Sequence, residues 1–83
     1  MIFLIFSEYG FDEVLANADD KTDRLWLNKG AVNDEALLLA QNDGWQIQVF
    51  SEMINVKSEQ AIVKAIKYIE KKWPHEVIEV EYL

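Results

Sequence analysis

The sequence predicts one small α/β domain over residues 1–83, in which four strands alternate with three helices in the order β-α-β-α-β-α-β. Three observations support this class. The length of 83 residues fits one compact domain. Short apolar, β-prone runs alternate with segments of helical periodicity. Hydrophobic residues make up 51% of the chain and include three Trp, three Tyr and four Phe, which are enough to fill a core without disulfides.

Seven segments carry these alternating patterns. We expect the strands over residues 2–6, 24–27, 45–50 and 76–83. We expect the helices over residues 11–18, 34–43 and 59–73. Helical crossovers between successive strands predict a mostly parallel sheet flanked by helices. An α+β fold with one antiparallel strand is the alternative, because the first helix is short.

The first two strands and the first helix have distinct local patterns. Residues 2–6, IFLIF, are continuously apolar, which is typical of a central strand covered on both faces. Gly10 interrupts this run, and the helix that follows is expected to carry Asp12 and Glu13 in its first turn, where negative charge suits the helix dipole. Residues 24–27, RLWL, form a short β-prone run that ends at a polar turn.

Capping residues mark the second and third helices. Asn33 and Ser58 are good N-caps, because their side chains accept hydrogen bonds from the first turn of a helix. Gly44 favours the left-handed conformation that ends many helices, and Pro74 prevents a helix from continuing. Between these helices, residues 45–50, WQIQVF, alternate apolar and polar side chains, which predicts a strand with one packed face.

The last strand has glutamates at alternate positions. Ile78, Val80 and Tyr82 alternate with Glu79 and Glu81. Charged side chains along an outer strand discourage pairing with another chain. We therefore expect an edge strand whose glutamates are exposed.

The charge balance limits the classes of partner. Eight basic and fifteen acidic residues give a net charge of −7. Binding to nucleic acid and to anionic membranes depends on basic side chains, so neither partner is expected. There is no cysteine and no apolar run long enough to cross a bilayer, so we expect a cytoplasmic protein.

Two strands end in the same dipeptide. Ser7-Glu8 follows the first strand, and Ser51-Glu52 follows the third. A sheet in the order 2-1-3-4 would place these strands side by side, with both dipeptides at the topological switch point where open α/β sheets bind ligands. Ser7, Glu8, Ser51 and Glu52 are therefore candidate ligand-binding residues. Glu8, Asp12 and Glu52 are candidate ligands for Mg²⁺. The competing interpretation is that these residues are solvated strand ends and a helix first turn.

The third helix carries most of the positive charge. Residues 57–72 contain five Lys and two Glu, a net charge of +3. Four lysines of this helix form a candidate interaction surface: Lys64, Lys67, Lys71 and Lys72. This surface suits an acidic partner or the acidic face of a second copy, and homodimers are common. A solvated helix face is the alternative.

No catalytic set is complete in the sequence. His75 is the only histidine, and neither a phosphate-binding glycine loop nor a nucleophile elbow is present. We therefore expect no catalytic residues and no cofactor. The function that fits best is a small acidic, non-catalytic protein-interaction domain that regulates or inhibits a protein partner. The alternative is a small metal-dependent enzyme or ligand-binding domain that uses Mg²⁺ and the carboxylates at the carboxyl ends of strands 1 and 3.

Overall fold

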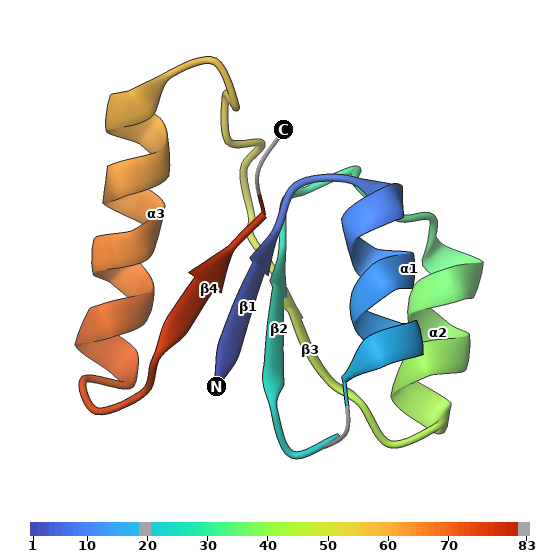
Figure 1. The fold of residues 1–83 in the computed structure, drawn as a ribbon. Coiled ribbons are helices and arrows are strands. Elements are labelled where there is room, and N and C mark those ends of the chain that lie inside the picture. The colour runs from blue at the N-terminus through green and yellow to red at the C-terminus, as the bar shows by residue number, and fades with distance from the viewer. Residues whose placement is uncertain (19–20, 82–83) are drawn as a thin grey trace.

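The computed structural model describes residues 1–18 and 21–81, and it confirms the predicted succession of strands and helices (Figure 1). The four strands are β1 (Ile2–Ile5), β2 (Arg24–Leu27), β3 (Gln46–Val49) and β4 (Ile78–Val80). The three helices are α1 (Glu8–Asn17), α2 (Asp34–Asn42) and α3 (Glu59–Lys72). Among the described residues, no helix is long and apolar enough to cross a membrane. Tyr82, predicted to belong to the last strand, lies outside the described residues.

The strands form one parallel sheet in the order β3-β2-β1-β4, so the predicted α/β class is confirmed and the α+β alternative is not. The predicted order 2-1-3-4 is wrong, because β2 lies between β1 and β3, and β4 pairs with β1. Figure 1 shows α1 and α2 on one face of the sheet and α3 on the other. Two crossovers on the same face carry the chain outward in one direction, and the third, on the opposite face, returns it past β2 and β1.

The central strand β1 is buried on both faces, as its apolar run predicts. Phe3 and Ile5 pack in the cluster beneath α1 and α2, whereas Ile2, Leu4 and Phe6 pack in the cluster beneath α3. This division follows from the alternation of side chains along a strand. The sheet is therefore the middle of three layers.

The predicted caps of α2 and α3 are confirmed, and the predicted start of α1 is wrong. Asn33 and Ser58 accept hydrogen bonds from the main chain at the third position of α2 and α3. Helix α1 begins three residues earlier than expected, at Glu8, because the Ser7 hydroxyl accepts a hydrogen bond from the Gly10 N–H. Asp12 therefore lies beyond the first turn.

The segment between β3 and α3 is fastened to the end of β2 by one side chain. Asn28 is the buried polar residue of the described core and is 6% exposed. Its Oδ1 accepts a hydrogen bond of 2.7 Å from the Ile54 N–H, and its Nδ2 donates one of 3.1 Å to the Ile54 carbonyl. Because both main-chain groups of Ile54 depend on Asn28, this residue positions the loop that precedes α3.

Replacing Asn28 is expected to loosen this loop and destabilise the fold. Asn28→Ala leaves two part-buried main-chain groups without partners, at about 1–3 kcal/mol each, so we expect a loss of about 2–6 kcal/mol in the free energy of unfolding. Urea denaturation measures the loss, and hydrogen exchange at the Ile54 amide reports the local opening. Asn55→Ala, an exposed loop residue nearby, is the control and should cost less than about 1 kcal/mol. Equal losses in the two variants would contradict this role.

Candidate functional site

The two strand-end dipeptides lie in different places. Glu8 begins α1 on one face of the sheet, whereas Ser51 and Glu52 follow β3 on the segment that leads to α3. Strand β2 separates β1 from β3. The prediction that β1 and β3 are neighbours, on which the pairing of the two dipeptides depended, is therefore wrong. Asp12 is exposed on α1. Over residues 1–18 and 21–81, no group of three or more histidine, aspartate or glutamate side chains is arranged to hold a metal ion.

The actual switch point lies at the carboxyl ends of β1 and β4, and a side chain of the protein fills it. Glu81 Oε1 accepts hydrogen bonds from the N–H groups of Phe6 (2.7 Å) and Ser7 (3.0 Å). The Ser7 hydroxyl donates to Glu81 Oε2. A negative charge at the N-terminus of α1 is favourable because of the helix dipole. The carboxylate therefore takes the position where open α/β sheets commonly bind an anionic ligand.

The Glu81 carboxylate lies directly against the main chain of Gly10. A Cβ atom added to Gly10 would lie 2.3 Å from Glu81 Cδ, closer than non-bonded carbon atoms approach. The expectation that both glutamates of the last strand are exposed is therefore correct for Glu79 and wrong for Glu81, which is half-buried. Glu81 therefore occupies the anion position of the switch point, and a smaller depression of about 320 Å³ remains beside it, lined by Gly10, Val14 and Glu81 among others.

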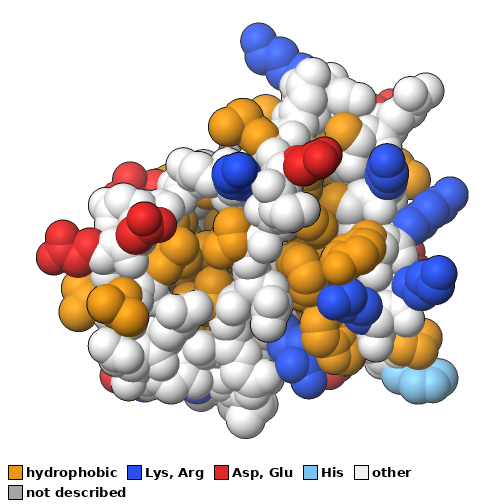
Figure 2. Space-filling model, turned by 180° about the vertical axis from the view of Figure 1, so that it is seen from behind, with side chains coloured by type: hydrophobic (Ala, Val, Ile, Leu, Met, Phe, Trp, Pro, Cys, Tyr) orange, Lys and Arg blue, Asp and Glu red, His pale blue; other side chains and the backbone are white. Residues whose placement is uncertain are grey.

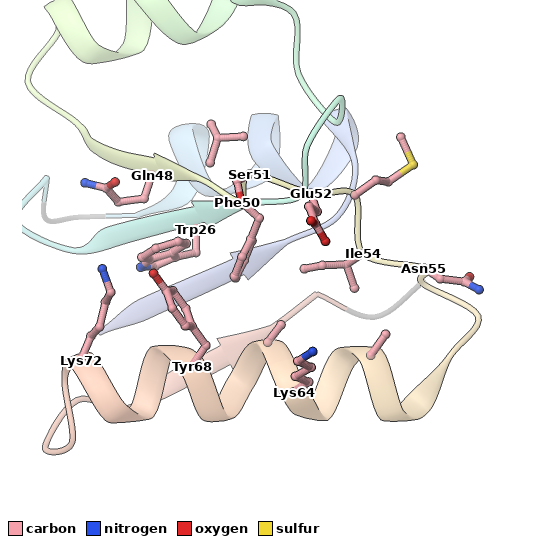
Figure 3. Close-up of a pocket in the computed structure, with 14 residues that line it drawn as sticks. Trp26, Gln48, Phe50, Ser51, Glu52, Ile54, Asn55, Lys64, Tyr68 and Lys72 are labelled. Atoms are coloured by element: carbon pink, nitrogen blue, oxygen red, sulfur yellow. The ribbon is translucent and has the colours of Figure 1, made fainter.

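An open groove lies elsewhere, between α3 and the end of β3. Helix α3 packs over β1 and β4, where Ala65 and Ile69 join the cluster of Ile2 and Leu4. The half of this face formed by β2 and β3 is left with a groove of about 610 Å³. We call it the aromatic groove. Its principal lining residues are Trp26, Gln48, Phe50, Glu52, Ile54, Lys64, Tyr68 and Lys72 (Figure 3).

Aromatic rings from three elements meet in this groove. The Trp26 ring lies 4.8 Å from the Phe50 ring and 5.6 Å from the Tyr68 ring, measured between centroids. Trp26 is 4% exposed, and Tyr68 is 47% exposed. The rings therefore form a wall that is buried at Trp26 and open to solvent at Tyr68.

A buried hydrogen-bond donor and an exposed ammonium group meet in the groove. Trp26 Nε1 is buried and has no hydrogen-bond partner among residues 1–18 and 21–81. Lys72 Nζ lies 5.6 Å from the centroid of the Trp26 ring and 5.1 Å from that of Tyr68. Within the described chain, Lys72 takes part in no ion pair. Figure 3 shows the indole nitrogen at the end of Trp26 nearest Lys72. A buried donor without a partner costs about 1–3 kcal/mol, so this corner favours an anionic acceptor.

The predicted lysine surface divides in the structure. Lys64 and Lys72 line the aromatic groove, and Lys64 and Lys67 border a shallow depression along α3. Lys71 is exposed and lines neither. Figure 2 shows Lys and Arg side chains gathered over α3 beside an apolar surface.

The aromatic part of the groove was not predicted from the sequence. Trp26 and Phe50 are there, as is Tyr68. One available signal was the spacing Lys64-Tyr68-Lys72, since residues four apart lie on one face of a helix. Ser51 and Glu52 also line the groove, so two of the four predicted ligand-binding residues belong to it.

Comparisons with protein-family models, with curated proteins and with solved structures find no match to this chain. A function can therefore be inferred for this chain only from the geometry of the groove.

The contact between Gly10 and Glu81 predicts that Gly10→Ala destabilises the wild-type protein but stabilises a Glu81→Ala variant. Gly10→Ala gains up to about 1 kcal/mol in helix propensity. It also displaces Glu81 from charge-assisted hydrogen bonds worth about 1.5–3 kcal/mol each. The loss of even one of them outweighs the gain, so we expect a net loss of at least about 0.5 kcal/mol. In a Glu81→Ala background the obstacle is gone, and Gly10→Ala should stabilise the fold. Thermal or urea unfolding of the four proteins measures this cycle. A loss that persists in the Glu81→Ala background would show that the carboxylate is not its cause.

Proposed function

We propose that the protein is a non-catalytic interaction domain that binds an acidic segment of a partner protein in the aromatic groove. The observation that carries this proposal is the buried indole N–H of Trp26, which has no partner in the described residues, beside the exposed ammonium group of Lys72. A carboxylate bound at this corner would pair with the ammonium group, and a shift of the side chains over Trp26 would let it accept from the indole. Hydrogen bonds to charged groups are stronger than those between neutral groups.

The surroundings of the donors favour a peptide over a small free anion. Beyond the Lys72 corner, the floor is formed by Phe50 and Ile54, which offer apolar contact to a side chain. Grooves that bind peptides combine such apolar pockets with a few polar residues in fixed positions. Lys64 and Glu52 lie at the other end of the groove (Figure 3), so that end presents both charges and the Lys72 end only a positive one. The groove can therefore orient an acidic segment.

The distribution of charge favours approach to this side of the molecule. The chain has a net charge of −7, yet residues 57–72, which contain α3, have a net charge of +3. An acidic segment is repelled by the body of the protein and attracted to α3, which steers encounters to the groove. A nucleic acid would meet the same repulsion along a much longer surface. The protein would act on its partner by occupying this segment, as a regulator or inhibitor does.

A titration followed by NMR tests this function. The probe is a blocked pentapeptide with four glutamates around a central phenylalanine, added to ¹⁵N-labelled protein. We expect the indole N–H resonance of Trp26 to shift on saturation, because it gains an acceptor. Lys72→Gln should weaken binding about tenfold, the equivalent of one charge-assisted hydrogen bond of about 1.5 kcal/mol. Raised salt should weaken it further.

Two controls separate groove binding from general attraction. Lys71→Gln makes the same change of charge on the same helix outside the groove and should leave the affinity within about twofold. The peptide with lysines in place of glutamates should not bind. Equal effects of Lys71→Gln and Lys72→Gln, or a Trp26 indole resonance that does not move on saturation, would contradict the proposal.

A further inference from the structure

The outer edge of β3 has main-chain groups that face away from the sheet. The Phe50 N–H donates to the Leu27 carbonyl of β2. Because successive residues of a parallel strand turn their main-chain groups to opposite sides, Gln46 and Gln48 also bond toward β2. The N–H and C=O groups of Ile47 and Val49 therefore point outward from the edge. No strand pairs with them in the described structure.

The two edges of the sheet differ in charge. On β4, Glu79 is exposed, and its charge disfavours pairing of this edge with another strand. The β3 edge has no such protection, because residues 44–51 form the longest uncharged run of the chain and contain no proline. An unprotected, β-prone edge strand is a template for pairing with a further strand.

We infer that β3 pairs antiparallel with β3 of a second copy of this chain, which joins the two sheets across a twofold axis. Apolar and polar side chains alternate along β3, so the β3 edges of two copies are complementary. On the face toward α2, Ile47 of one copy lies opposite Val49 of the other, so apolar meets apolar. On the opposite face, Gln48 lies opposite Gln48 of the second copy, so amide meets amide. Such an interface is isologous and closed.

The hydrogen bonds of neighbouring residues select this register. Centred on Gln48, the pairing satisfies all four outward groups of each edge, those of Ile47 and Val49. Centred on Ile47, it would require the Trp45 N–H to donate to Val49 of the second copy. That N–H already donates to the Ala40 carbonyl at 3.1 Å. The register centred on Gln48 is therefore favoured over the one centred on Ile47.

Helix α2 supplies a second apolar contact on the same face. Leu38 is 58% exposed and Leu39 is 64% exposed, although both are large and apolar. Residues of α2 pack on Leu25 of β2 and Ile47 of β3, so the helix lies over these two strands. Strands spaced about 4.8 Å apart would then place the two α2 axes about 10 Å apart across the dyad. Packed helices are about 8–10 Å apart, so the exposed leucines can meet.

The charges of the chain do not oppose this contact. Residues 36–42 of α2 are uncharged, as are residues 44–51. The one charge between these runs, Asp43, is paired with Lys21 at 2.9 Å. Two copies with a net charge of −7 each repel one another, and the uncharged residues 44–51 add no local repulsion at this edge.

Sedimentation equilibrium tests the dimer. The wild-type protein is expected to have twice the monomer mass of 9.7 kDa. Val49→Pro removes an outward N–H without removing a bond to β2, and it should raise the dissociation constant of the dimer at least about tenfold, because two hydrogen bonds are lost per dimer. Leu39→Glu should also dissociate it. Val63→Glu makes the same kind of change on α3 and should leave the dimer intact. Circular dichroism verifies that each variant is folded.

A cysteine cross-link tests the register, since the chain has no cysteine of its own. At a directly opposed, non-hydrogen-bonded pair the Cα atoms lie about 4.5 Å apart, within reach of a disulfide. Gln48→Cys should therefore form a covalent dimer under mild oxidation, whereas Gln60→Cys on α3 should not. A wild-type protein that is monomeric at millimolar concentration overturns the inference. So does a dimer that survives Val49→Pro, or equal cross-linking of the two cysteine variants.

Discussion

A single helix, α3, packs on one of the two faces of the four-stranded sheet, and the rest of the structure depends on this. A helix with its side chains is about 10–12 Å wide, and strands lie about 4.8 Å apart, so one helix covers about two strands. Helix α3 covers β1 and β4, where Ala65 and Ile69 contact β1 side chains. The β2 and β3 half of that face is covered by loop and strand side chains, chiefly Trp26, Phe50 and Ile54. The aromatic groove is the space that this incomplete layer leaves.

A side chain of the protein itself takes the position where an anionic ligand would ordinarily bind. Open α/β sheets use the switch point at the carboxyl ends of their strands. Here Glu81 folds back from β4 and supplies the negative charge that the start of α1 favours. Gly10 admits the carboxylate because it has no side chain. The molecule therefore satisfies this anion site internally, and the larger aromatic groove lies on the far side of the sheet, beside α3.

The groove and the β3 edge are adjacent, which relates the two proposals. Gln48 and Val49 border the groove and also belong to the edge strand. A twofold axis perpendicular to the joined sheet keeps both copies of α3 on the same face, so both grooves would open to one side. A partner with two acidic segments would then bind with a raised effective concentration at the second groove. The negative charge of the chain is excluded from residues 44–51, where the two copies would meet.

Local chemistry in the sequence determined the elements of this protein. The caps Asn33 and Ser58, the positive φ of Gly44 and the apolar run of β1 depend only on neighbouring residues, and all are found as predicted. The tertiary structure alone decided the strand order, because an apolar pattern shows that a strand is covered but not which strand is beside it. It also decided that Glu81 is bound while Glu79 is exposed, and that Lys72 lies over Trp26. Glu81 is distant in sequence from Phe6 and Ser7, and Lys72 is distant from Trp26. Only packing of the helices on the sheet brings these residues together.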